Sequence, residues 1–183
     1  MSDIKKELVG LQVLYIEWDA GLFERMRKKL SRHGANVLIE TNLDEAKRKI
    51  KDNRPILNLV ISNERIPPTF GDYFQITELL KEKRRQIGIM IREEKNGNHD
   101  SEEMQKARER NQILTIKQEN FLKSWYKNGY ELVKILAEGK PIPLLFFSSF
   151  GDMFEKKMPA HTKLLLMPAN ENELIDAIKE ILP

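Results

Sequence analysis

The chain has 183 residues, of which 40% are hydrophobic and 32% charged, with a formal net charge of +3 and no cysteine. These values are typical of one globular domain, and they exclude a disulfide framework, a thiolate metal site and a cysteine nucleophile. The three histidines are widely separated, which argues against a zinc site, and the positive excess is too small to indicate nucleic-acid binding without a clustered patch.

The beginning of the chain gives no sign of a targeting segment. Residues 1–11 carry early charges and lack a long apolar core, so they do not resemble a signal peptide. No apolar run approaches the about 20 residues that a membrane helix needs. We therefore expect a cytoplasmic protein without a membrane partner.

The first third of the chain alternates short apolar runs with amphipathic segments. Apolar runs predict strands, and a period of three to four residues predicts helices. Asn42 or Thr41 is placed to cap the second helix. The predicted elements are a strand at 13–16, a helix at 20–33, a strand at 37–39, a helix at 43–51 and a strand at 56–62.

The end of the chain repeats this alternation. A helix is predicted at 129–138, strands at 144–147 and 164–166, and a last helix at 171–182. Strands that alternate with helices indicate an α/β fold with a parallel sheet covered on both faces.

Residues 64–128 interrupt the rhythm with a highly charged segment that contains one clear loop at 95–100. Apolar residues before and after the loop have helical spacing, so a helical hairpin is the preferred interpretation. The run 87–91 is also compatible with an additional strand, because glycine and branched residues disfavour a helix.

Five segments, taken together and in order, resemble the response-regulator receiver (CheY-like) family. Parallel sheets place their chemistry after the carboxyl ends of their strands, and four of these segments end there. The segments are Val13–Asp19, with its acidic end, Leu59–Pro67, Asn128–Leu132, Pro143–Gly151 and Leu164–Pro168.

This resemblance implies a flavodoxin-like, doubly wound parallel sheet of five strands in the order 2-1-3-4-5. Residues 1–183 would form a single receiver-like domain with its core at 12–63 and 129–182. Residues 64–128 would be a largely helical insertion between the third strand and the third helix.

The resemblance also assigns a degenerate phosphorylation pocket. Receivers phosphorylate an aspartate with the help of Mg²⁺, a lysine and a hydroxyl group. Here Asn63 stands at the phosphoacceptor position, Met167 at the lysine and Trp18 at the second acid, while Glu17 and Ser148 are retained. An amide cannot form an acyl phosphate, so the resemblance implies a pseudo-receiver that is not an enzyme.

The retained residues leave several interpretations open. Glu17 and Asp19 are either solvated carboxylates or ligands of a weak Mg²⁺ site, and no other cofactor is expected. Ser148 either caps a helix or binds an anion. Trp18 either fills the altered pocket or packs against neighbouring loops.

Other conspicuous patterns favour ordinary structural roles. The basic run at 81–85 lies among acids and is interpreted as a solvated helix face, which argues against nucleic acid as a partner. Trp125, Tyr126 and Tyr130 have helical spacing typical of core, with a partner-binding group as the alternative. No hydrolase triad or phosphate-binding glycine loop is present.

These observations predict a signalling or scaffold module of the two-component type that binds another protein without being phosphorylated. The alternatives are a small-ligand or metal sensor that uses the altered pocket, and a nucleic-acid-binding protein. A homodimer is left open, and the identity of the protein partner is not indicated.

Overall fold

The computed structural model has an α/β fold built on one sheet of five parallel strands in the order β2-β1-β3-β4-β5. This order confirms the predicted flavodoxin-like fold class. The described residues are 7–148, 161–166 and 169–182, apart from the side chain of Tyr126. The strands are β1 (Gln12–Ile16), β2 (Asn36–Glu40), β3 (Leu59–Asn63), β4 (Leu144–Ser148) and β5 (Thr162–Leu166).

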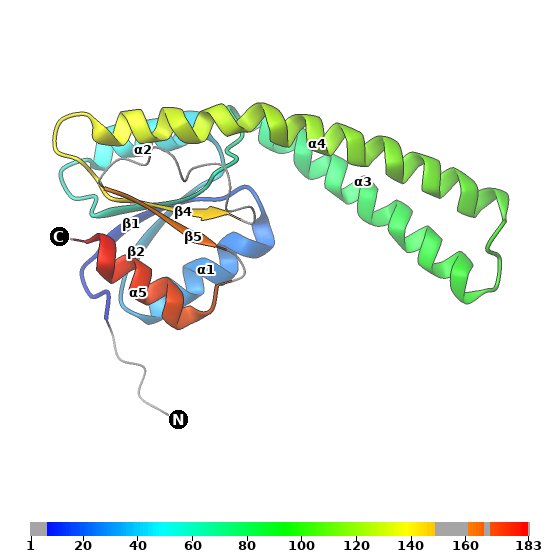
Figure 1. Cartoon of the computed structure of the whole chain (residues 1–183), viewed down its shortest axis with the longest axis horizontal. Coiled ribbons are helices and arrows are strands. Elements are labelled where there is room, and N and C mark those ends of the chain that lie inside the picture. The colour runs from blue at the N-terminus through cyan, green and yellow to red at the C-terminus, as the bar shows by residue number, and fades with distance from the viewer. Residues whose placement is uncertain (1–6, 149–160, 167–168, 183) are drawn as a thin grey trace, which may run out of the picture. The chain divides into compact units, whose positions relative to one another are not determined.

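Helices cover both faces of the sheet (Figure 1). Helices α1 (Ala20–Arg32) and α5 (Glu171–Ile181) pack on one face, and α2 (Leu43–Asn53) packs on the other together with the last turns of α4 (Glu102–Ala137). Because the central strands are buried on both sides, their sequences are continuous apolar runs rather than alternating ones.

Successive residues of each strand enter opposite cores. In β1, Leu14 and Ile16 belong to the core under α2 and α4, whereas Val13 and Tyr15 belong to the core under α1 and α5. All four side chains are at most 1% exposed. The helices complete these cores with one apolar stripe each, such as Leu30 of α1.

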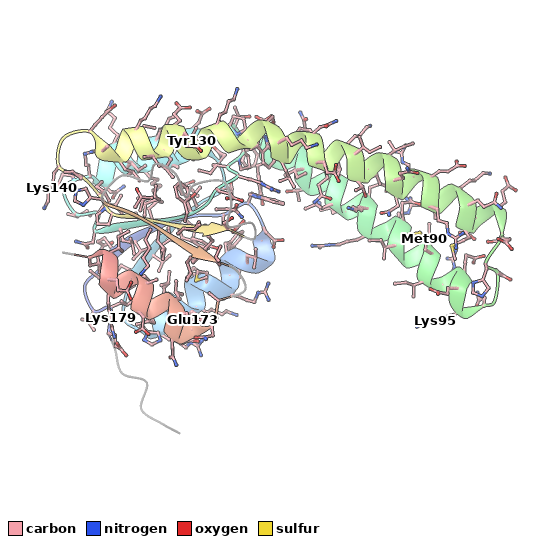
Figure 2. The ribbon with its side chains drawn as sticks, in the orientation of Figure 1. Met90, Lys95, Tyr130, Lys140, Glu173 and Lys179 are labelled. Carbon is pink, nitrogen blue, oxygen red and sulfur yellow. The ribbon has the colours of Figure 1, made fainter. Side chains whose placement is uncertain are left out.

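Side-chain caps fix where the helices begin. Asn42 caps α2 by accepting a hydrogen bond from the backbone N–H of Glu45 at 3.0 Å, so of the two predicted caps it is Asn42 that acts. Asn170 and Glu173 form a reciprocal capping box at the start of α5. Glu173 and Lys179 of this helix are both exposed and are labelled in Figure 2.

The chain divides into two compact units. The sheet unit consists of residues 1–70 and 125–183, and the hairpin unit consists of residues 71–124. The hairpin unit lies within the segment that the sequence assigns to an insertion, and it is helical on both sides of its loop. Helix α4 contributes to both units, because it runs without a break from Glu102 to Ala137.

The two arms of the hairpin are α3 (Phe70–Lys95) and the first part of α4, which run antiparallel to each other. The run 87–91 is part of α3, which resolves the alternative of an additional strand in favour of a helix. The helix predicted at 129–138 is the end of α4 and not a separate element.

Local hydrogen bonds form the tight loop between the arms. Gly97 adopts a positive φ of 76° just past α3, and its N–H bonds to the carbonyl of Glu94 at 3.1 Å. The N–H of Asn98 bonds to the carbonyl of Glu93 at 2.9 Å, which completes a Schellman ending. Ser101 then caps α4 through the N–H of Met104.

On each arm of the hairpin, one stripe of buried and half-buried positions recurs at alternating intervals of three and four residues, the spacing of a coiled-coil seam. Met90, labelled in Figure 2, is one of them. The seam positions of α3 are Ile76, Leu79, Lys83, Gln86, Met90 and Glu93, and those of α4 are Met104, Ala107, Asn111, Leu114, Gln118 and Phe121. Lys83 donates to Gln118 across the seam at 2.9 Å. Polar residues therefore occupy a large part of the surface that joins the arms.

None of the helices in the described stretches of the chain combines the length and apolar character needed to cross a lipid bilayer.

Candidate functional site

The carboxyl ends of β1, β3 and β4 bring the predicted pocket residues to one edge of the sheet. Strand register pairs Ile16 with Ser62, and Asn63 with Phe147. Glu17 therefore follows β1 beside the end of β3, and Ser148 ends β4 one residue further along the same edge. Met167 lies outside the described residues.

Glu17 is a buried carboxyl group at this edge, with 2% of the residue exposed. Its side chain accepts hydrogen bonds from the Tyr15 hydroxyl at 3.2 Å and from the backbone N–H of Asp19 at 3.0 Å. It also shares a hydrogen bond with the side chain of Asn63. Burial nevertheless raises the pKa of Glu17 to about 7.

The Tyr15 hydroxyl is affected in the same direction. Burial, reinforced by the negative charge of Glu17, raises the pKa of Tyr15 far above its ordinary value. The tyrosine therefore stays protonated and acts as a hydrogen-bond donor to the carboxylate.

Asn63 ties the ends of two strands together. Its side-chain oxygen accepts the backbone N–H of Arg65 at 3.1 Å, which leaves its amide nitrogen as the donor to Glu17. An aspartate at this position accepts the first of these bonds but cannot donate the second when ionised. The amide at the predicted phosphoacceptor position is thus used by the fold itself.

Asp19 has a structural role as the N-cap of α1. Its Oδ1 accepts the backbone N–H groups of Gly21 at 2.8 Å and Leu22 at 3.1 Å. Among the described residues, no group of three or more histidine, aspartate or glutamate side chains is gathered as for a metal ion. Weak Mg²⁺ binding at Glu17 and Asp19 stays a prediction.

Glu64 is the site residue that the sequence analysis missed. Only 2% of it is exposed, and burial raises its pKa. The Ser148 hydroxyl donates a hydrogen bond to its carboxylate, and Arg65 Nε lies 3.9 Å from its Oε1. Its Oε2 has no hydrogen-bond partner in the described part of the structure. The sequence signal was a lone acid directly after a buried strand.

Ser148 therefore bonds to an acid of the neighbouring strand end. It is 2% exposed and lies in β4 itself. The residues that follow it, 149–160, lie outside the described residues, so the predicted cap or anion site at this point stays a prediction.

Trp18 packs against another tryptophan of the sheet unit. Its ring meets that of Trp125 edge to face, with centroids 6.0 Å apart and planes at 74°. The indole nitrogen of Trp18 is buried and has no hydrogen-bond partner among the described atoms. Of the predicted aromatic group, Trp125 belongs to the core at 1% exposure, whereas Tyr130 is 47% exposed.

A second candidate site lies entirely within the hairpin unit. A cavity of about 730 Å³ opens between α3 and α4, with Phe74, Leu79 and Phe121 among its lining residues. Glu78 and Lys117 supply one charge from each helix. We call this cavity the hairpin groove. Phe74 is 56% exposed and gives the groove an aromatic surface.

The basic run at 81–85 is largely neutralised by its neighbours. Lys81 lies 2.6 Å from Glu78, and Arg85 lies 3.8 Å from Glu82. Lys83 turns into the seam. This arrangement agrees with the predicted mixed helix face.

Comparison of the chain with protein-family models, with curated proteins and with solved structures found no match.

Proposed function

We propose that this chain is a non-phosphorylatable, receiver-like module that acts by binding a protein partner, and that the partner docks in the hairpin groove. The observation that carries the proposal is the groove itself. It combines the exposed ring of Phe74 with Leu79 and Phe121 in a concave surface large enough for side chains of a partner.

The state of the strand ends supports binding rather than phosphoryl transfer. The amide of Asn63 is not an acceptor for a phosphoryl group, and it is already bonded to Glu17 and to the backbone of Arg65. The carboxylate of Asp19 caps α1. What remains of the resemblance to receivers is the fold and two polar side chains.

The construction of the hairpin supports the groove as the docking site. A seam with several polar residues gains less from apolar burial than a fully apolar one. Apolar side chains are also exposed on the hairpin unit outside the groove, namely Ile87 at 38%, Ile91 at 48%, Ile113 at 47% and Ile116 at 53%. Two antiparallel helices with an apolar groove suit an amphipathic helix, which would place its apolar side against Phe74 and Phe121.

One pair of variants tests the groove in the full-length chain. Phe74→Glu places a charge in the groove, and Ile56→Glu places the same charge on the sheet unit at a residue that is also 56% exposed. A quantitative pulldown from the native host should show a partner retained by the wild type and by Ile56→Glu. Phe74→Glu should reduce that capture by about tenfold or more. Equal capture by both variants would remove the groove from the proposal.

A separate experiment tests the absence of phosphorylation. The chain is incubated with acetyl phosphate and Mg²⁺, and its intact mass is measured. We expect no phosphoryl adduct, and we expect Asn63→Asp to restore little, because Met167 and Trp18 stand where the resemblance places the lysine and the second acid. An adduct on the wild-type chain would contradict the proposal.

A small-ligand or metal sensor is the second candidate, and the buried carboxyl groups favour it. Burial raises the pKa of both Glu17 and Glu64, and a bound cation would stabilise their ionised forms. Thermal unfolding with and without Mg²⁺ or Mn²⁺ tests this function. A stabilisation that Glu17→Gln abolishes would favour the sensor over the protein-binding module.

A further inference from the structure

The positive charge of the chain is concentrated on one helix. Helix α1 contains five basic residues and one acid, a net charge of +4, whereas the whole chain has a net charge of +3. All other residues together therefore sum to −1. Helix α1 therefore carries a clustered basic patch, which the composition alone did not indicate.

Four of these basic residues share one side of the helix. Arg25, Lys28, Lys29 and Arg32 are spaced at intervals of three and four residues and line a surface hollow of about 610 Å³ with Ser31. The opposite side of α1, with Phe23, Met26 and Leu30, packs into the core of the sheet unit. We call the four basic residues the α1 basic face.

The acids near this face neutralise only its end. Glu171 of α5 lies 3.1 Å from Arg32 and 3.0 Å from His33. Glu24 pairs with Arg27, which is not part of the face. Arg25 donates to the carbonyl of Gly21 and keeps its charge. Neither Lys28 nor Lys29 takes part in an ion pair within the described residues, and Lys28 is exposed whereas Lys29 is half-buried.

The chemistry of the face selects among anionic partners. An anionic membrane surface also attracts basic side chains, but firm attachment of a surface helix adds an inserted apolar side, and the apolar side of α1 is buried in the core. A protein interface would need a buried apolar centre, because exposed ion pairs alone contribute only about 0–1 kcal/mol each. A nucleic-acid backbone needs neither, since neutralising its phosphates releases condensed counterions and drives binding.

We propose that the α1 basic face binds the phosphate backbone of nucleic acid without reading its sequence. Arg25, Lys28 and Lys29 would contact phosphates, and Arg32 would contribute only in part because of Glu171. Among the described residues, no aromatic side chain on which bases could stack lines the hollow. This inference is independent of the hairpin groove and of its partner.

Two triple variants of the full-length chain test the proposal. Arg25→Gln, Lys28→Gln and Lys29→Gln remove three charges from the α1 basic face. Lys81→Gln, Arg84→Gln and Arg85→Gln remove three charges from the hairpin, so both variants lower the formal net charge by the same amount. The measurement is fluorescence anisotropy of labelled DNA duplexes of two unrelated sequences between about 50 and 200 mM salt.

The wild type should bind both duplexes equally, with a slope of log Kobs against log salt of about −3. The α1 variant should lose about tenfold or more in affinity at low salt and most of the slope. The hairpin variant should stay within about threefold of the wild type. Equal losses in both variants would show that net charge rather than α1 is responsible, and would overturn the proposal.

Two further arms complete the experiment. Circular dichroism reports whether the α1 triple variant is folded. If the triple variant is unfolded, the single variant Lys28→Glu, which reverses one exposed charge, is used in its place. Labelled poly-glutamate and anionic lipid vesicles are titrated under the same conditions. If the wild type bound poly-glutamate or the vesicles more tightly than the duplexes, and the α1 variant lost that binding, the face would be assigned to that class of partner. This result would contradict the nucleic-acid proposal.

Discussion

At the scale of single residues, the contact between Glu17 and Asn63 decides the character of the strand-end site. A buried carboxyl group is tolerated there because three donors surround it, and the Asn63 amide supplies the one that reaches across from β3. The receiver resemblance marks Asn63 as a position that has lost its phosphoacceptor aspartate. In this fold the same residue provides a hydrogen-bond donor to Glu17. Its replacement should have consequences for stability that are measurable apart from any activity.

Asn63→Asp should destabilise the fold at neutral and alkaline pH. The new carboxylate loses the donation to Glu17 and places a second negative charge beside it, which we expect to lower the free energy of unfolding by about 1–3 kcal/mol at pH 8. The effect should be smaller at pH 5, where a protonated Glu17 can donate to the new group. Urea unfolding at both pH values measures it.

Asn58→Asp provides the matched control. Asn58 precedes β3, and its side-chain oxygen accepts the backbone N–H of Gln12 at 2.8 Å, a bond that an aspartate can also accept. The control should change stability by less than about 0.5 kcal/mol. If the two variants were equally destabilised, the bond from Asn63 to Glu17 would not be the cause.

Glu17 should make the stability of the fold depend on pH. Its pKa is about 7 in the folded state, against an ordinary value of 4.5, so between these values the folded state binds more protons than the unfolded state. The free energy of unfolding should therefore fall as the pH rises from 4.5 to 7, by roughly 3 kcal/mol from this residue.

Glu17→Gln isolates this contribution. The variant cannot ionise at this position, so the difference between wild type and variant, measured by urea unfolding from pH 4 to pH 8, should shift in favour of the variant as the pH rises. Other buried acids contribute equally to both proteins and cancel in the difference. A difference that does not change with pH would show that Glu17 ionises as readily in the folded as in the unfolded chain.

Three site residues could be predicted from the sequence because each lies at the end of an apolar run that predicts a strand. Glu17, Asn63 and Ser148 stand directly at such ends, and parallel pairing brings these ends together. The acid that bonds Ser148 was not predicted, because an acid after a strand is normally solvated. Only tertiary packing buries Glu64.

At the scale of secondary-structure elements, the hairpin seam combines apolar and polar layers. Asn111 occupies a seam position on α4, and its Oδ1 is buried without a hydrogen-bond partner in the described structure. An unpaired buried acceptor costs free energy, whereas an apolar side chain of similar size at a seam position gains it. Asn111 thus lowers the stability of the hairpin.

Asn111→Leu should therefore stabilise the hairpin by about 1–2 kcal/mol. Hydrogen exchange of the backbone amides of α3 and α4 within the hairpin unit measures the change locally. Gln118→Leu is the control at another seam position, where the substitution removes the bond from Lys83 and should give a smaller gain or a loss. If hydrogen exchange became equally slower in both variants, the added apolar burial at the seam would be the cause. Removal of the unpaired Asn111 acceptor would then not be the cause.

The elements of the sheet were predictable because burial on both faces produces continuous apolar runs. The run 87–91 was ambiguous because glycine and branched residues disfavour a helix and because five residues do not distinguish a strand from a helix. The structure resolves it through context, as the helical spacing of α3 continues on both sides. Gly129 suggested the start of a helix, yet it is a buried residue within α4.

At the scale of the whole molecule, the two units should differ in their resistance to unfolding. Both tryptophans of the chain, Trp18 and Trp125, belong to the sheet unit and pack on each other. The hairpin unit contains no tryptophan but includes long stretches of helix. Tryptophan fluorescence therefore reports the sheet unit, while circular dichroism at the helical minimum reports both units.

In urea, the loss of helical signal should begin at a lower concentration than the change in tryptophan fluorescence. The polar seam gives the hairpin less apolar burial than the two cores of the sheet unit, so it should unfold first. Asn111→Leu should bring the two transitions closer together. Superimposable transitions in the wild type would show that the whole chain unfolds in one cooperative step.

The division into units followed from the sequence only in outline. A charged segment between two α/β halves indicated an insertion, and the alternation around it indicated the sheet. The sequence could not show that α4 belongs to both units, because apolar spacing alone does not tell which partner covers a helix. In the structure, Leu114 is buried in the hairpin unit, and Leu132 is buried in the core of the sheet unit.

Because α4 belongs to both units, the length of the hairpin can change only in steps that preserve the seam. The alternating intervals of three and four residues run from Met104 through Trp125 to Leu132 without a change of phase. Seven residues inserted into each arm would lengthen it by about 10 Å and keep the same sides facing inward. Two inserted residues would turn everything beyond them by roughly 200° and bring charged side chains into the seam. Longer or shorter versions of this protein should therefore differ by whole repeats of seven.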